Sequence, residues 1–229
     1  MFRSYLKTTI RFLLKNRNFS FINIIGLAIG TLCCLYILVY VGEQYSYDKW
    51  EDHAADTYRI ISDMKLSGDH NRMASSSPAI APGMKRDFPE VQQYTRALNP
   101  SIFGADQHLL KYKGQSFFDK QVLFVDSTFF DVFTFPFVRG SASGALSRPF
   151  TVVLGKATAE KLFGKEDPVG KSIKINNKAG EESLEVTGVI DVSQARSHIQ
   201  ADVFCNHEHR AHRGYRKARY ELGRTQYVI

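Results

Sequence analysis

Two clusters of residues have the types and spacing that could perform chemistry. In the first, Gly164, Gly170 and Lys171 have the composition of a phosphate-binding loop. A P-loop surrounds phosphate with backbone N–H groups, its glycines are separated by four residues, and it lies between a strand and a helix. Here five residues separate Gly164 from Gly170, and a predicted helix precedes them. The segment therefore predicts a turn, and we expect no nucleotide-binding site in this chain.

The second cluster lies near the C-terminus, where one thiol and three imidazoles could supply ligands to a metal ion. They are Cys205, His207, His209 and His212. Alternate-residue histidines match no standard zinc spacing, and no second group of ligands is visible in the sequence. We therefore expect neither a metal site nor a cofactor, and zinc measured by mass spectrometry would test this expectation.

Catalytic side chains form no convergent set. Asp48, Asp52 and Asp56 are spaced four residues apart and could share one helix face, but a solvated helix end accounts for them. Ser75 to Ser77 lack the strand-to-helix turn that exposes a nucleophilic serine, so a loop is predicted there. We expect a protein that is not an enzyme.

The elements that position these residues begin with a membrane helix. Residues Phe19 to Val41 contain no charged side chain. A helix of this length rises about 34 Å, enough to cross a hydrocarbon core of about 30 Å. A cleaved signal peptide has a shorter apolar region and a small-residue cleavage site, and the sequence matches neither feature. We therefore predict an uncleaved transmembrane helix over 19–41.

Charge predicts the orientation of this helix. Residues 1–18 carry five basic and no acidic side chains, among them Arg11, Lys15 and Arg17. The positive-inside rule places this lead in the cytoplasm and everything after Gly42 on the other side of the membrane. The lead also alternates apolar and basic residues at helical spacing. It either lies on the inner leaflet and contacts membrane lipid, or serves only as a topology signal.

Within the predicted span, Gly26 and Gly30 form a G-x-x-x-G pair on one helix face. Such a pair lets a second helix approach closely. Glycine is also common in membrane helices for no specific reason, so the packing interpretation and the incidental one both stay open.

The net charge of +7 is concentrated at the two ends of the chain, in residues 1–18 and 205–229. The region between them is close to neutral. Nucleic-acid binding needs a basic face on the globular part, so this class of function is excluded. Only Cys205 lies outside the predicted span, which excludes an intrachain disulfide.

The region after the membrane helix mixes strands and short helices. Strands are predicted over 57–62, 93–98, 121–125, 151–154, 172–175 and 185–190. Helices are predicted over 82–88 and 157–163, with a helical turn through Phe133 that Ser127 caps. Asn176 and Asn177 are expected to form a turn, and the phenylalanines from Phe129 to Phe137 to form core instead of a partner surface. This order predicts an α+β fold with a mixed sheet.

Several stretches, in order along the chain, resemble the periplasmic core domain of MacB/FtsX-type ABC transporter permeases. They are FINIIGLAIG (21–30), YSYDKWEDHAADTYRI (45–60), DFPEVQQYTR (87–96), VDSTFFDVFTFPFVRG (125–140), TVVLGKATAEKLFGKEDPVGKSIKI (151–175) and VTGVIDV (186–192). The resemblance covers residues 3–204 and implies that 42–204 form this core domain. It also implies a periplasmic mixed α/β domain of two subdomains, joined to a helix in the inner membrane.

The resemblance implies a permease that forms a dimer, binds a cytoplasmic ABC ATPase subunit and has three more membrane helices near its C-terminus. ATP-driven helix movement would then reach the periplasmic domain, which acts in export, in extraction or on a periplasmic protein partner. The residues that would couple span to domain are Tyr47, Asp48, Trp50 and Tyr58. The chain would then be an N-terminal fragment of such a permease.

Residues 205–229 depart from the family pattern, because they lose apolar periodicity and contain six basic side chains. We interpret this tail as out-of-frame translation after a frameshift or gene break, which the downstream DNA read in its other frames would test. An alternative function is a singly anchored periplasmic sensor or adaptor that binds a protein or ligand without an ATPase. A neighbouring ATPase gene favours the permease, and a neighbouring kinase or regulator gene favours the sensor.

Overall fold

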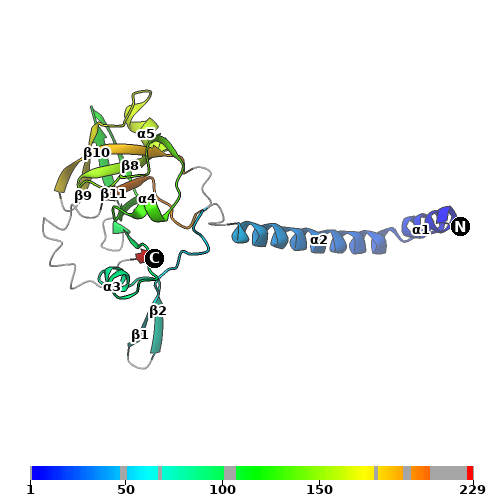
Figure 1. Ribbon diagram of the computed structural model, residues 1–229. Helices are drawn as coiled ribbons and strands as arrows, with labels where there is room; N and C mark the ends of the chain where they lie inside the picture. The colour runs from blue at the N-terminus through cyan, green and yellow to red at the C-terminus, as the bar shows by residue number, and fades with distance from the viewer. Residues whose placement is uncertain are drawn as a thin grey trace. The chain divides into compact units, whose positions relative to one another are not determined.

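The computed structural model describes residues 2–46, 51–66, 69–100, 107–177, 180–192, 197–206 and 226–228. The chain divides into two compact units, Met1–Tyr47 and Asp48–Ile229. The first unit is helical, and the second is a sheet with short helices (Figure 1).

The N-terminal unit consists of two helices, α1 (Phe2–Lys15) and α2 (Arg17–Tyr45). In the described part of the chain, α2 is the one helix long and apolar enough to cross a membrane. It includes the predicted range 19–41 and extends beyond it at both ends. The helical path breaks at Asn16, and Ser20 Oγ donates across the break to the Leu13 carbonyl oxygen at 3.1 Å. The break separates a basic helix from an apolar one.

The second unit is built on a ten-stranded mixed sheet. Its path runs β12 (Gln226–Val228), β3 (Thr95–Leu98), β6 (Val122–Val125), β11 (Val203–Asn206), β8 (Thr151–Gly155), β10 (Gly180–Ile190), β9 (Ser172–Asn177), β4 (His108–Tyr112) and β5 (Gln115–Asp119). β7 (Phe137–Gly140) pairs with β10 beside this path, and β1 (Ser62–Leu66) and β2 (Asp69–Met73) form a separate hairpin. The helices of this unit are α3 (Ile80–Asp87), α4 (Phe129–Val132) and α5 (Lys156–Phe163).

Parallel and antiparallel pairs alternate in the centre of the sheet. β10 is parallel to β8 and β11 is parallel to β6, whereas β11 and β8 are antiparallel. The predicted α+β fold with a mixed sheet is confirmed. The division into two subdomains stays a prediction.

The central strand β8 is buried along its whole length, and its alternating side chains divide the core in two. Val152 and Leu154 pack in one cluster with Leu162 of α5. Val153 packs in the other cluster with Phe129 of α4. Successive side chains of a strand point to opposite faces, so a strand covered on both faces is apolar throughout. α4 and α5 lie beside β8, β10 and β11 (Figure 1).

Helix α5 has a glycine at each end. The Gly155 N–H donates to the Asp202 carbonyl oxygen at 2.7 Å, and a Cβ on Gly155 would lie 3.2 Å from that oxygen. After the last turn of α5, Gly164 has a φ of 61°, a conformation that favours glycine. The predicted helix over 157–163 and its glycine stop are confirmed.

The prediction of a strand over 57–62 is wrong, because β1 begins only at Ser62. The preceding segment bonds elsewhere: Arg59 Nη2 donates to the Ala74 carbonyl oxygen at 3.1 Å. The other predicted strands and the predicted helix near residue 82 are present with shifted ends. Sequence reasoning missed the β1–β2 hairpin, the β4–β5 hairpin, β7, β11 and β12.

Two predicted turn and cap roles are also wrong. Ser127 does not cap α4, because the residue directly before this helix is Thr128. The Thr128 hydroxyl donates to the Tyr94 carbonyl oxygen at 2.7 Å. Asn176 and Asn177 lie within β9, in register with β10, and not in a turn. Asn176 also pairs with Leu109 of β4, so for the asparagines sheet pairing outweighs the local preference for a turn.

Candidate coupling site

Of the four residues predicted to couple span to domain, the structure describes Tyr58. Its side chain is 68% exposed, so it packs little against the domain. Tyr47, Asp48 and Trp50 lie outside the described residues. Whether the four residues come together is therefore not tested, and their coupling role stays a prediction.

The described chain after the helix is attached to the domain through Glu51. Its Oε2 accepts a hydrogen bond from the backbone N–H of Thr134 at 2.7 Å. Thr134 follows α4, and its neighbours Phe133 and Phe135 are only 8% and 5% exposed. A carboxylate that accepts a backbone N–H forms a charge-assisted bond, roughly twice as strong as a neutral one. Sequence reasoning missed Glu51 because no local pattern links it to a residue so far along the chain.

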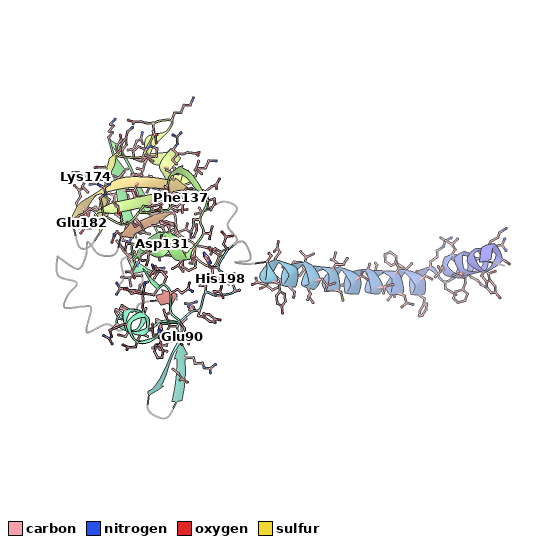
Figure 2. All side chains as sticks on the ribbon, in the orientation of Figure 1. Glu90, Asp131, Phe137, Lys174, Glu182 and His198 are labelled. Atoms are coloured by element: carbon pink, nitrogen blue, oxygen red, sulfur yellow. The ribbon has the colours of Figure 1, made fainter. Side chains whose placement is uncertain are left out.

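The phenylalanines beside this contact form an aromatic cluster packed ring to ring. Its members are Phe129, Phe130, Phe133, Phe135 and Phe204, all buried. The ring centroid of Phe129 lies 5.0 Å from that of Phe133 and 5.4 Å from that of Phe204. Phe137, labelled in Figure 2, is half-buried and packs against Phe130 at 5.1 Å. The prediction that these phenylalanines form core is confirmed.

Two hydrogen bonds between described residues attach residues 51–59, which we call the tether, to the rest of the domain. The first is Glu51, and a turn follows it in which the Ala54 N–H donates to the Glu51 carbonyl oxygen at 3.2 Å. The second is the bond from Arg59 to the carbonyl oxygen of Ala74 at 3.1 Å. Internal turns and two attachments give the tether a defined path.

A buried ion pair fixes the chain after the β1–β2 hairpin to the sheet. Arg96 of β3 donates to both carboxylate oxygens of Asp126, from Nε at 2.7 Å and from Nη2 at 2.9 Å. Its Nη1 donates to the Pro78 carbonyl oxygen at 3.3 Å, just before α3. The two side chains are 10% and 8% exposed, so little water competes with the pair. The pair holds together β3, the end of β6 and the start of α3.

The residues predicted to pack and orient the membrane helix lie on α1 and α2. Gly26 and Gly30 are one turn apart on α2, and a Cβ on either would meet nothing within 4 Å. Arg11 and Lys15 belong to α1, and Arg17 begins α2. The glycine face has room for a second helix, and the packing and topology roles stay predictions.

The segment from Gly164 to Lys171 forms turns, as predicted. Gly164 and Gly170 have φ angles of 61° and 79°. Glu166 forms ion pairs with Lys171 and, at 3.1 Å, with Lys113. Hydrogen bonds from these two lysines lower the pKa of the Glu166 carboxyl group below its ordinary value. A carboxylate that pairs with the lysine disfavours phosphate at the same place.

Of the predicted candidate metal ligands, the structure describes Cys205, which is fully buried in β11. His207, His209 and His212 lie outside the described residues. Within the described ranges, no group of three or more His, Cys, Asp or Glu side chains is placed to hold a metal ion.

Strand β11 continues past the predicted domain boundary after residue 204. Asn206 is fully buried, and its Nδ2 donates to the carbonyl oxygens of Leu146 and, at 3.2 Å, Arg148. Cys205 packs in the same core cluster as Val152. The first two residues of the predicted tail therefore belong to the core. The out-of-frame origin of the tail stays a prediction.

Solved structures similar to this chain include a domain of a putative permease protein from Porphyromonas gingivalis. It has a TM-score of 0.60 at 19% identity, over 78% of this chain and 74% of that chain. The extracellular domain of the noncanonic ABC-type transporter YknZ from Gram-positive bacteria has a TM-score of 0.47 at 19% identity, over 75% and 79%. The periplasmic region of MacB from Actinobacillus actinomycetemcomitans has a TM-score of 0.48 at 16% identity, over 75% and 72%. The first of these likenesses supports the observed fold.

Among curated proteins, no sequence matches this chain. The family model of the MacB-like periplasmic core domain matches residues 20–228, a range that includes both α2 and the sheet. The chain therefore belongs to the family of the MacB-like periplasmic core domain.

Proposed function

We propose that this protein is a permease component of an ABC transporter, anchored in the inner membrane by α2 with its domain in the periplasm. The observation that carries the proposal is the succession of one long apolar helix and a MacB-like periplasmic core domain. In this proposal the protein catalyses no reaction. A cytoplasmic partner subunit hydrolyses ATP, and movement of α2 reaches the domain through the tether.

Two features of the helical unit support the proposal that it contacts membrane lipid and a second permease subunit. α1 carries basic side chains at four-residue spacing, Lys7, Arg11 and Lys15, and exposes large aromatic ones, Tyr5 at 74% and Phe12 at 62%. Such a helix lies in the interface and binds anionic lipid. The open glycine face of α2 suits the matching helix of a second permease subunit.

Co-purification tests the proposed role. The full chain is expressed with its neighbouring genes, extracted in mild detergent and captured by an affinity tag. We expect an ABC ATPase subunit in the captured complex. Capture of a histidine kinase or other regulator without any ATPase would contradict the permease and support a singly anchored sensor.

Cysteine labelling tests the proposed orientation. Asp52→Cys and Lys15→Cys are introduced separately into a chain whose own cysteines are replaced by serine. In intact spheroplasts a membrane-impermeant maleimide is expected to label position 52, and to label position 15 only after lysis. The reverse pattern would contradict a cytoplasmic N-terminus.

A further inference from the structure

We infer that Glu51 is the positioning residue through which movement of the membrane helix enters the sheet domain, an inference that rests on the proposed function. Glu51 follows the end of α2 at Tyr45 by six residues. Six extended residues span at most about 20 Å. The end of α2 and Glu51 therefore cannot lie farther apart than this reach. A movement of α2 that would exceed it pulls on the first attached side chain of the tether, which in the described chain is Glu51.

The bond of Glu51 leads into the core. Its acceptor oxygen lies 2.7 Å from the Thr134 nitrogen, and the Phe133 N–H on one side of Thr134 donates to the Phe129 carbonyl oxygen at 2.9 Å. On the other side, the Pro136 carbonyl oxygen accepts from the Asp191 N–H at 3.0 Å, at the end of β10. A close-packed interior transmits a displacement instead of absorbing it. A pull on Thr134 therefore reaches both the aromatic cluster and β10.

The second attachment of the tether leads elsewhere. Arg59 bonds to Ala74, next to the β1–β2 hairpin, which is not a part of the ten-stranded sheet. A pull at Arg59 moves this hairpin before it moves the sheet. Glu51 is thus the attachment of the tether that leads directly to the ten-stranded sheet.

Amide hydrogen exchange on the full chain in lipid nanodiscs tests the attachment without any partner. In Glu51→Ala we expect exchange at the Thr134 amide to accelerate at least about tenfold, because a hydrogen bond to a charged group is lost. Glu51→Gln, which keeps a neutral acceptor, is expected to give a smaller acceleration. Asp52→Ala, a change of the exposed neighbour, is the matched control and is expected to leave the Thr134 amide unchanged. Equal exchange in wild type and both Glu51 variants would overturn the inference.

The same measurement in complex with the ATPase subunit tests the coupling. In wild type we expect ATP to change the protection of residues 129–137, and in Glu51→Ala this ATP-dependent change is expected to disappear while the ATPase still binds. Persistence of the change in Glu51→Ala would overturn the inference. Failure of the ATPase to bind the wild-type chain would instead refute the proposed function, and exchange at Thr134 in the chain alone would still decide whether Glu51 is an attachment. Glu51→Gln keeps both tests usable if the alanine variant does not fold.

Discussion

Glycines lie both in helix α2 and at the pairing of strands β7 and β10, which we call the β7–β10 crossing, but for different reasons. In α2, a Cβ on Gly26 or Gly30 would meet nothing within 4 Å. At the crossing, a Cβ on Gly140 would lie 2.4 Å from the Thr187 carbonyl oxygen, and one on Gly188 would lie 2.6 Å from the Phe137 ring. The sheet glycines are thus required by contacts within the chain. Among the described residues, no contact requires the helix glycines.

Polar groups show the same contrast. Arg96 and Asp126 are buried and satisfy each other inside the domain. In α2 the side chains point outward, and Thr31 Oγ1 bonds only to its own helix, at the Leu27 carbonyl oxygen. The described domain thus satisfies this buried pair within itself, whereas the helix presents apolar surface that lipid or another helix can cover.

Among the tests of this contrast, loss of the buried ion pair is expected to have the largest effect on the free energy of unfolding. Arg96→Ala leaves the Asp126 carboxylate buried without its partner, so we expect the free energy of unfolding to fall by about 3–5 kcal/mol. Urea unfolding of the full chain in detergent, followed by circular dichroism, measures this change. Arg86→Ala is the matched control, because Arg86 pairs with Asp87 at the surface, and it is expected to leave the midpoint unchanged. Equal midpoints for both variants would show that the domain does not depend on this pair.

A somewhat smaller loss is expected at the β7–β10 crossing. Gly140→Ala forces a residue with a side chain to φ 77° and presses its Cβ against backbone, so we expect a loss of about 3 kcal/mol. Gly114→Ala shares the positive φ of 87° but has open space around it. Its loss in the same urea experiment is expected to be about 1 kcal/mol, from strain alone. If the two variants unfold alike, close approach is not what requires Gly140.

A pH-dependent effect is expected at Asp202. Burial, and secondarily the charge of Asp119, raise the pKa of the Asp202 carboxyl group above its ordinary value of 3.8. The raised pKa means that the folded state holds this proton more tightly. Its stabilising contribution is therefore fully present below the unfolded-state pKa and is lost as pH rises through the folded-state value.

Asp202→Asn removes the cost of charging this group, so at pH 7 the variant is expected to unfold at slightly higher urea than wild type. At pH 3, where the aspartate is protonated in both states, the two proteins are expected to unfold alike. The same advantage at both pH values would mean that the variant acts through packing and not through charge.

The smallest effect on unfolding is expected in α2. Gly26→Leu and Gly30→Leu have space for the new side chains, so we expect no change in the unfolding of the domain. If a second subunit packs on this face, the dimer fraction measured by chemical cross-linking in membranes is expected to fall severalfold. Ala28→Leu, between the two glycines but on another helix face, is the control. An unchanged dimer fraction would leave both glycines without a packing role.

The segments that were predicted best from the sequence carry complete local signals. The strand over 151–154 and the helix over 157–163 have an apolar run, helical periodicity and a closing glycine within a short stretch. Hairpin β4–β5 was missed because its turn, at Lys113 and Gly114, has no standard turn pair. The boundary after residue 204 cut β11 short, because no local pattern marks Cys205 and Asn206 as part of a strand. They become core only when β11 pairs between β6 and β8.

The sequence by itself determined the apolar helix with its basic lead, the α+β class and the family resemblance. Each of these depends on periodicity, composition or short motifs, which neighbouring residues encode. Only the tertiary structure decided that β11 lies between β6 and β8, that Arg96 pairs with Asp126 and that Glu51 bonds to Thr134. These contacts join residues far apart along the chain, and many alternative pairings have similar local preferences. The sheet selects among them through the burial and hydrogen bonding of the whole domain.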